Sequence, residues 1–212
     1  MIAVIDYGAG NLRNICKALE FVGAKIILTD DPKVIQQADK IVLPGVGAFA
    51  DCANGLRARG LFELMQRIGQ RGTPFLGICV GMQLLFEVGE EMGAWPGLGL
   101  LPGHVIRFDF ARTPPHQSSP PAQSLKIPHI GWNNVKPVQA HILLKGVPDS
   151  GYAYFVHSYH AGMTNPDHVL ATTDYGYDFP SVVGHANVMG IQFHPEKSQD
   201  VGLQMLKNFA EM

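Results

Sequence analysis

Residues 74–83 read Pro-Phe-Leu-Gly-Ile-Cys-Val-Gly-Met-Gln, an apolar run that passes directly into a Gly-x-Cys-x-Gly turn. The run at 74–78 predicts a buried strand, and Met82–Glu87 predicts the helix after the turn. Glycine on both sides of Cys79 allows a sharp, strained turn that exposes the thiol at the end of the strand. A helix N-terminus favours a thiolate and presents free N–H groups. Cys79 is therefore a candidate nucleophile, and a buried structural cysteine is the alternative.

Upstream of this turn, short apolar runs alternate with residues at helical spacing. Strands are predicted at Ile2–Ile5, Lys25–Thr29 and Lys40–Leu43, and helices at residues 11–23 and 61–72. Asn11 is the expected N-cap of the first helix, and Gly23 is its expected stop. Apolar strands separated by helices imply a parallel sheet that is covered on both faces.

The second half of the chain has a different pattern. Further strands are predicted at 98–108, 134–138, 152–157, 168–173 and 181–193, the last folded as a hairpin around Ala186-Asn187, and a helix at 198–212 closes the chain. Residues 112–121, rich in proline and serine, are expected to be a mobile surface insertion, with a binding lid as the alternative. We predict a single α/β domain over 1–212. Its sheet is doubly wound, mixed and mostly parallel, is flanked by helices, and has an antiparallel section in the second half.

Composition excludes several classes of function. The 212 residues are 46% hydrophobic and 16% charged, and 16 basic against 18 acidic residues give a formal charge of −2. Binding to nucleic acid or to an anionic membrane needs a clustered basic surface, so neither is expected. No apolar run approaches the ~18 residues of a membrane span, and the N-terminus does not resemble a signal peptide. Three cysteines, Cys16, Cys52 and Cys79, match no zinc-ligand spacing and fit a reducing cytoplasm. Cys16 and Cys52 are expected to be structural.

A thiolate nucleophile needs a base and a group that orients the base, and the segment after the last predicted strand provides both. This strand ends in His194-Pro195-Glu196. Pro195 keeps His194 out of the helical region, and in an extended chain positions i and i+2 point the same way. Catalytic groups collect at the carboxyl ends of parallel strands, where Cys79 also lies. The pattern predicts a Cys79–His194–Glu196 triad, and a surface His-Pro-Glu turn is the alternative.

The turn Pro44-Gly45-Val46-Gly47 follows a predicted strand and is a candidate oxyanion loop. Glycines on both sides of Val46 allow a backbone N–H of Gly45 or Val46 to be presented to a ligand, beside the Val80 N–H. A plain tight loop is the alternative. If the loop needs a partner to aim its amide, the isolated chain should turn over slowly.

Two other patterns are rejected. Gly8-Ala9-Gly10 suggests a dinucleotide loop, but Arg13 stands where the third glycine belongs. His157 and His160 have no carboxylate or cysteine at ligand spacing, so a polar pocket wall is expected there rather than a metal site.

The segment 77–83, paired with His194-Pro195-Glu196, resembles the signature of the triad-type (class I) glutamine amidotransferases. Within that class, four further segments resemble the glutaminase subunits of imidazole glycerol phosphate synthase: 6–11, 44–47, 128–133 and 194–198. The similarity extends over residues 1–212 and fails only near 110–124, where this chain looks longer than the pattern requires.

The resemblance implies a mechanism and a set of site residues. Cys79 attacks the side-chain amide of glutamine, His194 moves protons and Glu196 orients His194. The Val80 N–H and an amide of the Gly45–Gly47 loop stabilise the oxyanion, and no cofactor or metal takes part. The residues that the resemblance places around the substrate are Gly47, Gln83, His157, Ser158 and Tyr159.

The resemblance also implies a partner. In this family ammonia passes to a separate cyclase subunit of (β/α)8 fold, with which the glutaminase forms a heterodimer in histidine biosynthesis. The cyclase makes imidazole glycerol phosphate and an aminoimidazole carboxamide ribotide. This chain has no second domain long enough for that barrel, so the partner is expected to be another polypeptide. The family motifs place four residues at the interface: Asn11, Trp132, Asn133 and Lys197. Trp132 is the expected anchor, and a core tryptophan is the alternative.

Three rival functions remain open at this point. One is the glutaminase subunit of another ammonia-using synthase, such as pyridoxal phosphate synthase. Another is a stand-alone cysteine hydrolase that cleaves γ-glutamyl amides without a partner. The third is a catalytically dead subunit that keeps the fold.

Overall fold

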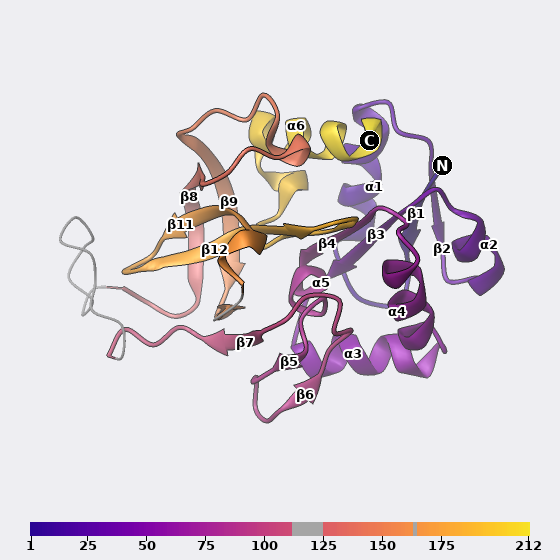
Figure 1. The fold of residues 1–212 in the computed structure, drawn as a ribbon, viewed down its shortest axis with the longest axis horizontal. Coiled ribbons are helices and arrows are strands. Elements are labelled where there is room, and N and C mark those ends of the chain that lie inside the picture. Colours follow the sequence, from indigo (N-terminus) through magenta and orange to yellow (C-terminus); the bar gives the residue numbers. More distant parts are fainter. Residues whose placement is uncertain (112–124, 163–164) are drawn as a thin grey trace.

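The computed structural model describes residues 1–111, 125–162 and 165–212, and its main sheet has nine strands (Figure 1). In spatial order the strands are β2 (Ile26–Thr29), β1 (Ile2–Ile5), β3 (Lys40–Gly45), β4 (Phe75–Cys79), β13 (Val188–Ile191), β12 (Asp178–His185), β11 (Val169–Asp174), β8 (His129–Pro137) and β9 (Gly151–His157). The segment predicted as a loop at 112–121 lies outside the described residues.

The sheet changes direction at β13. This strand pairs in parallel with β4 and antiparallel with β12. The pairs from β2 to β13 are parallel, whereas those from β13 to β9 are antiparallel. The predicted fold class, a doubly wound mixed sheet that is flanked by helices and has an antiparallel section, is confirmed. The expectation that the sheet is mostly parallel is wrong, because four of the eight neighbouring pairs in the described sheet are parallel and four are antiparallel.

Helices cover both faces of the parallel half (Figure 1). Helices α1 (Leu12–Phe21) and α6 (Gln199–Glu211) lie on one face, and α3 (Phe49–Ala58) and α4 (Phe62–Gln70) lie on the other. Helix α2 (Pro32–Gln37) has Asp31 as its N-cap, whose side chain accepts a hydrogen bond from the Lys33 N–H at 2.8 Å. In α4 the stripe that predicted the helix, which includes Leu64, Met65 and Ile68, is buried against the sheet.

A second sheet of four short strands packs beside the first. Its order is β10 (Tyr159–Ala161), β7 (His104–Arg107), β5 (Val88–Gly89) and β6 (Trp95–Pro96). Three single-turn helices complete the described elements: η2 (Ile142–Leu144), η3 (Pro166–His168) and η4 (Pro195–Lys197). Strands of two or three residues have no detectable period, so the sequence did not predict β5, β6 or β10.

The helix predicted at 82–87 and the strand predicted at 98–108 are both largely wrong, and for a common reason. Helix α5 covers only Val80–Gln83, and strand β7 begins at His104. The Leu98 N–H donates to the Leu84 carbonyl at 2.7 Å, and the Leu100 N–H donates to the Leu85 carbonyl at 2.8 Å. The loop thus takes the carbonyls that a longer helix would use. By contrast, the hairpin predicted at 181–193 is confirmed.

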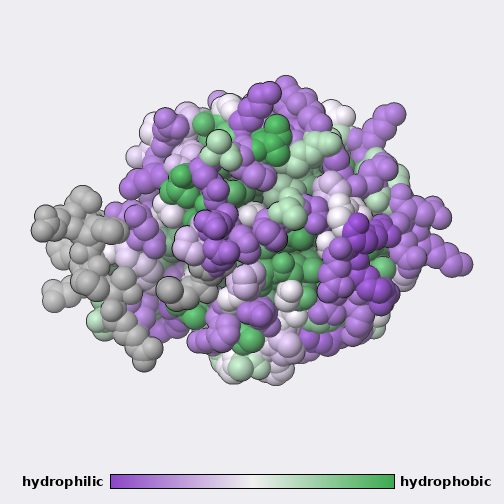
Figure 2. Space-filling model, in the orientation of Figure 1, coloured by the Kyte–Doolittle hydropathy of each residue, from purple (hydrophilic) through white to green (hydrophobic). Residues whose placement is uncertain are grey.

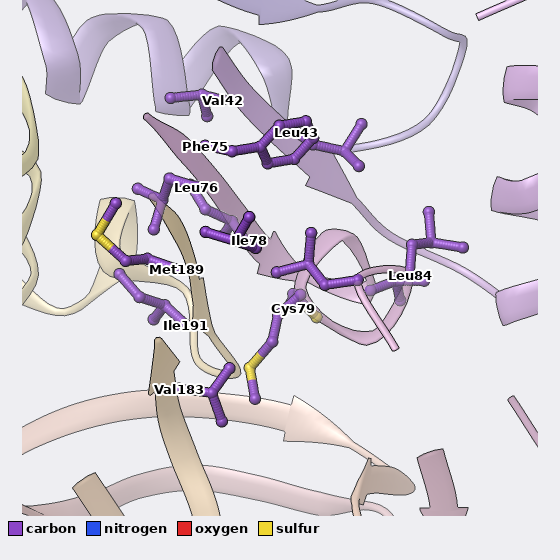
Figure 3. Close-up of a cluster of buried hydrophobic side chains, with 14 of the residues drawn as sticks. Val42, Leu43, Phe75, Leu76, Ile78, Cys79, Leu84, Val183, Met189 and Ile191 are labelled. Atoms are coloured by element: carbon purple, nitrogen blue, oxygen red, sulfur yellow. The ribbon is translucent and has the colours of Figure 1, made fainter. Parts of the chain in front are cut away.

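The core lies between the sheet and its helices. Figure 3 shows Leu43 of β3, Leu76 and Ile78 of β4 and Ile191 of β13 packed together, with Cys79 at the end of β4. The four aliphatic side chains are at most 1% exposed. On the face shown in Figure 2, hydrophobic residues gather near the middle, and hydrophilic residues surround and interrupt them. None of the helices in the described part of the chain has the length and apolar character needed to cross a membrane.

Candidate active site

Cys79 occupies a strained turn between β4 and α5. Its backbone has φ 55° and ψ −115°, a conformation that costs a residue other than glycine on the order of 1–3 kcal/mol. A Cβ on Gly77 would lie 2.5 Å from the Gly81 oxygen, and one on Gly81 would lie 1.9 Å from the Leu43 oxygen. Both glycines of the Gly-x-Cys-x-Gly turn are therefore required, because neighbouring backbone approaches each too closely for a side chain.

His194 and Glu196 follow β13 and form a buried pair. His194 Nδ1 lies 2.9 Å from Glu196 Oε1, and the two side chains are 5% and 0% exposed. The same carboxylate oxygen accepts a hydrogen bond from Asn11 Nδ2 at 3.0 Å. The backbone of His194 is extended, as the following proline requires, and its carbonyl accepts a hydrogen bond from Ser198 Oγ at 2.6 Å.

The protonation of His194 links it to both other members of the predicted triad. Burial by itself lowers the pKa of His194, but hydrogen bonds to Cys79 and Glu196 outweigh it and raise the pKa to about 10. The imidazole therefore holds a proton at pH 7 and is hydrogen-bonded to Cys79. The structure brings Cys79, His194 and Glu196 together, and the carboxylate fixes the orientation of the ring.

The loop at Pro44–Gly47 packs directly against this turn. Gly45 lies opposite Cys79 in the β3–β4 register, and a Cβ on Gly45 would lie 2.6 Å from the Gly81 nitrogen. The buried Tyr7 hydroxyl donates a hydrogen bond to the Pro44 carbonyl at 2.6 Å. The loop is thus held close to Cys79 by glycine on one side and by a buried tyrosine on the other.

The other two cysteines are placed for packing. Cys52 is buried on α3, its Sγ lies 3.6 Å from the Val46 carbonyl oxygen, and burial raises the pKa of its thiol to about 11. Cys16 is partly buried on α1, and burial raises the pKa of its thiol as well. Both thiols are protonated at pH 7, which suits a structural role.

A cavity of about 200 Å³ opens beside the thiol. It is lined by Val46, Gly47, Cys79, Val80, Gln83, Glu91, Val156, His157, Ser158, Tyr159 and His194. All five residues predicted around the substrate are among them. Gln83 Nε2 donates to the Tyr159 carbonyl at 2.9 Å and to Gln192 Oε1 at 3.2 Å. Because both N–H bonds of this amide are used, its carbonyl oxygen remains for a ligand.

Glu91 and Val156 are the residues of this cavity that the sequence did not predict, and Glu91 is the charged one. Its Oε2 accepts a hydrogen bond from the Phe49 N–H at 2.7 Å, at the first turn of α3. Glu91 belongs to no motif, and its local signal is the acidic pair Glu90-Glu91 after the Gly-x-Cys-x-Gly turn. It places a carboxylate in the cavity wall.

The four residues predicted at a partner interface divide into two groups. Trp132 is 48% exposed, packs edge-on against Tyr154 at 6.1 Å, and shares that neighbour with Lys197, whose Nζ lies 5.5 Å from the Tyr154 ring centre. The side chains of Asn11 and Asn133 are bound within the chain. Asn11 donates to Glu196, as described above, and Asn133 Nδ2 donates to the Asp174 carbonyl at 2.9 Å.

Within residues 1–111, 125–162 and 165–212, no group of three or more histidine, cysteine, aspartate or glutamate side chains is arranged to hold a metal ion. His157 lines the cavity, whereas His160 is hydrogen-bonded to the Tyr177 hydroxyl at 2.8 Å.

The sequence matches a family model described as class-I glutamine amidotransferase over residues 3–212. Imidazole glycerol phosphate synthase subunit HisH of Salinibacter ruber is 51% identical over 212 residues, which cover 100% of this chain and 94% of that protein. The chain belongs to the HisH family of class-I glutamine amidotransferases. The HisH subunit of Syntrophotalea carbinolica is 48% identical and is covered over 100% of both chains. The predicted family and enzyme class are confirmed.

Solved structures of other amidotransferases share the fold. A crystal structure of a glutamine amidotransferase superposes with a TM-score of 0.73 at 19% identity, covering 100% of both chains. The structure of PurLQS from Thermotoga maritima gives 0.70 at 17% identity, covering 99% of this chain and 97% of that one. At these identities the likeness concerns the fold alone.

Proposed function

We propose that this chain hydrolyses glutamine to glutamate and ammonia with Cys79 as nucleophile, and that it delivers the ammonia to a cyclase subunit. The observation that carries the proposal is the arrangement of the strained Cys79 turn beside a His194 that is hydrogen-bonded to Glu196 at 2.9 Å. A base that is oriented by a third group, next to a nucleophile, is the arrangement that covalent catalysis requires.

Acylation begins with the Cys79 thiolate, which His194 stabilises as an imidazolium. The sulfur attacks the side-chain amide carbon of glutamine, and the carbonyl oxygen becomes an oxyanion. When this intermediate collapses, the C–N bond breaks, His194 gives its proton to the leaving nitrogen, and ammonia departs. The product is a γ-glutamyl thioester on Cys79.

Deacylation uses the same groups in the opposite sense. The neutral His194 takes a proton from water, the hydroxide attacks the thioester carbonyl, and glutamate leaves as the C–S bond breaks. Glu196 keeps Nδ1 of His194 protonated throughout, so Nε2 remains the nitrogen that accepts and gives protons.

Backbone N–H groups are expected to stabilise both oxyanions. The Val80 N–H is at the first position of α5, directly after Cys79, and Gly45 lies opposite Cys79 in the β3–β4 register. Each donor of this kind contributes on the order of 10²–10³ in rate. Partner binding that aims the loop amide would therefore raise turnover by about this factor.

Recognition of glutamine rests on the polar atoms of the cavity wall. The carboxylate of Glu91 can bind the α-ammonium group of the substrate, because it is the acidic side chain that lines the cavity. The carbonyl oxygen of Gln83 is a second acceptor, since its own amide N–H groups are already used. An ammonium group and acceptors of this kind distinguish glutamine from a simple amide.

The outer face of β8 and β9 is the proposed docking surface for the cyclase. Cross-strand pairs place Trp132 opposite Tyr154 and Ile130 opposite Val156 on this face. Trp132 and Ile130 are 48% and 59% exposed, and Val156 also lines the cavity beside Cys79. A partner that covers this apolar face would close the mouth of the site and receive ammonia without loss to water.

The curated relatives are named as subunits of imidazole glycerol phosphate synthase, which supports a heteromeric assembly. By this resemblance the partner is a separate (β/α)8 cyclase, the complex is a heterodimer of the cytoplasm, and the pathway is histidine biosynthesis. Free cysteines at three described positions fit a reducing compartment.

The test is glutamate release from glutamine by the chain alone, with the cyclase subunit, and with the cyclase subunit plus its ribotide ligand. A Cys79→Ala variant runs in parallel. A rise that requires both the partner and Cys79 supports the proposal. Equal, substantial turnover without the partner would instead identify a stand-alone amide hydrolase, and no turnover in any arm would favour a dead subunit.

A further inference from the structure

Two histidines face each other on the inner side of the β8–β9 pair, next to the substrate cavity. His129 and His157 are directly opposite in the strand register, and His129 Nδ1 lies 3.1 Å from His157 Nε2. Both are buried, at 3% and 6% exposure. His157 lines the cavity, whereas His129 is stacked behind it between Phe155 and Tyr175, at ring distances of 4.9 and 4.0 Å.

The hydrogen-bond partners on either side of this histidine pair determine which ring nitrogen of each histidine is protonated. At one end, Asn133 Oδ1 accepts from the Asn134 N–H at 2.8 Å and Asn133 Nδ2 donates to the Asp174 carbonyl at 2.9 Å, so this amide has one possible orientation. Its second N–H therefore points at His129 Nε2, 3.3 Å away, which must be unprotonated. The proton of His129 must then be on Nδ1, directed at His157.

The same reasoning continues to the cavity. His157 Nε2 accepts from His129, so the proton of His157 is on Nδ1, which lies 2.9 Å from the Tyr159 carbonyl oxygen. A carbonyl can only accept, which agrees with this assignment. The Tyr159 carbonyl also accepts the Gln83 side-chain amide at 2.9 Å. The chain of donors thus ends on the carbonyl that orients the Gln83 side chain in the glutamine site.

Burial keeps both imidazoles neutral, as this pattern requires. It lowers the pKa of His129 to about 4 and that of His157 well below its ordinary value. The groups in contact with the two rings are aromatic rings, the Asn133 amide and backbone carbonyls. His160 and the protonated His194 are the titratable neighbours of His157, and both lower its pKa further. A second proton on either ring would place two N–H groups against each other.

We propose that Asn133, His129 and His157 form a relay of fixed tautomers that positions Tyr159 and Gln83 for glutamine, and that His129 is a positioning residue for substrate binding. His129 does this without lining the cavity. If its donor is removed, His157 Nε2 loses its hydrogen bond, and the His157 ring is then held less firmly against the Tyr159 carbonyl. The inference rests on the proposed glutaminase function and adds a residue to it.

The tautomers are tested by NMR independently of any activity. Long-range ¹H–¹⁵N spectra of ¹⁵N-histidine-labelled chain distinguish imidazoles protonated on Nδ1 from those protonated on Nε2. We expect both His129 and His157 in the Nδ1–H form, which is the minor form of free histidine. In His129→Phe, the ¹⁵N resonance of His157 Nε2 should shift toward that of an unprotonated nitrogen without a hydrogen bond. An Nε2–H form of either residue in the unaltered chain would overturn the relay.

The positioning role is tested by glutamine kinetics in the presence of the cyclase subunit. His129→Phe keeps the stacked ring but removes the donor, and should raise KM for glutamine about 5- to 30-fold, the effect of one lost hydrogen bond. The value of kcat should stay within about threefold, because the triad is untouched. His129→Gln restores one donor and one acceptor and should recover most of the lost affinity.

His160→Phe is the matched control. His160 is equally buried in the same aromatic cluster, and its ring bonds go to the Ala161 carbonyl and the Tyr177 hydroxyl instead of the cavity wall. This variant should lose about as much stability as His129→Phe but should leave KM for glutamine unchanged. An equal rise of KM in both variants, or none in His129→Phe, would refute the positioning role. Absence of turnover in the unaltered chain would refute the proposed function instead and leave the NMR result to decide the relay.

Discussion

Replacing Glu196 with glutamine removes one buried charge from the proposed triad and keeps the shape of the side chain. The glutamine oxygen can still accept the hydrogen bonds that Oε1 now takes from His194 at 2.9 Å and from Asn11 at 3.0 Å. What is lost is the negative charge that supports an imidazolium in a site where the two side chains are 5% and 0% exposed. The variant therefore isolates the electrostatic part of the pair.

The expected loss follows from the protonation of His194. The shift of its pKa from 6.5 to about 10 corresponds to on the order of 5 kcal/mol in favour of the imidazolium, shared between Cys79 and Glu196. Without the carboxylate the pKa of His194 falls, and less imidazolium is available to stabilise the thiolate and to protonate the leaving nitrogen. General acid–base catalysis contributes about 10²–10⁴ in rate, so kcat should fall by a factor in that range.

Stability should respond to pH with a definite sign. A raised histidine pKa contributes stability that is fully present below pH 6.5 and is lost as the pH rises through about 10. Glu196→Gln removes part of this contribution, about 1–2 kcal/mol. Urea denaturation should therefore show the largest difference between the unaltered chain and the variant below pH 6.5, and a shrinking difference toward pH 10.

The chain contains a matched control for this experiment. His104 and Glu90 have the same separation, 2.9 Å from Nδ1 to Oε1, but their side chains are 53% and 49% exposed. Glu90→Gln should change glutamate release by less than twofold and stability by less than about 0.5 kcal/mol, because solvent screens an exposed pair. Equal effects of the two substitutions on kcat, or an unchanged kcat in Glu196→Gln, would refute the assignment of Glu196 as the group that orients and charges His194.

Three further substitutions test other parts of the site. Gly81→Ala should destabilise the fold by more than about 3 kcal/mol or prevent folding, because the new Cβ would lie 1.9 Å from the Leu43 oxygen; a normal thermal melt would contradict this. Glu91→Gln should raise KM for glutamine about 10- to 100-fold while iodoacetamide still alkylates Cys79 at the unaltered rate, and an unchanged KM would exclude Glu91 from binding the ammonium group. Trp132→Ala should weaken binding of the cyclase about 30-fold in calorimetry, and unchanged affinity in a folded variant would reject the anchor role.

The sequence predicted the parallel half of the sheet well because its strands are buried on both faces. Ile2–Ile5 and Phe75–Cys79 are buried at every position, so each reads as an unbroken apolar run. The proposed triad could also be predicted from the sequence. The Cys79 turn depends on glycines two residues away on either side, and His194 and Glu196 are two residues apart. In each case the information lies within about ten residues of chain.

Helix α3 was missed because its determinants are distant in sequence. Its N-cap, Ala48, has no side-chain hydrogen bond, and the first N–H is capped by Glu91, 42 residues away. Inside the helix stands Gly55, where a Cβ would lie 3.1 Å from Tyr7. Close packing against Tyr7 therefore requires glycine at position 55, although glycine has a low helix propensity. Glu91 escaped prediction as a site residue for the same reason.

The site lies where the sheet changes from parallel to antiparallel pairing. Strand β13 is the last parallel strand, and its pairing of Ile191 with Ile78 of β4 brings Cys79 and His194 to the same edge. Beyond β13 the strands are antiparallel and need no helical crossovers between them. Side chains from both faces of these strands can therefore be placed around one site. β9 directs His157 inward to the substrate cavity, and its exposed Val156 borders both that cavity and the proposed docking surface. The parallel half thus supplies the nucleophile. The antiparallel half supplies a cavity wall whose inner face contacts the substrate site and whose outer face is the proposed docking surface.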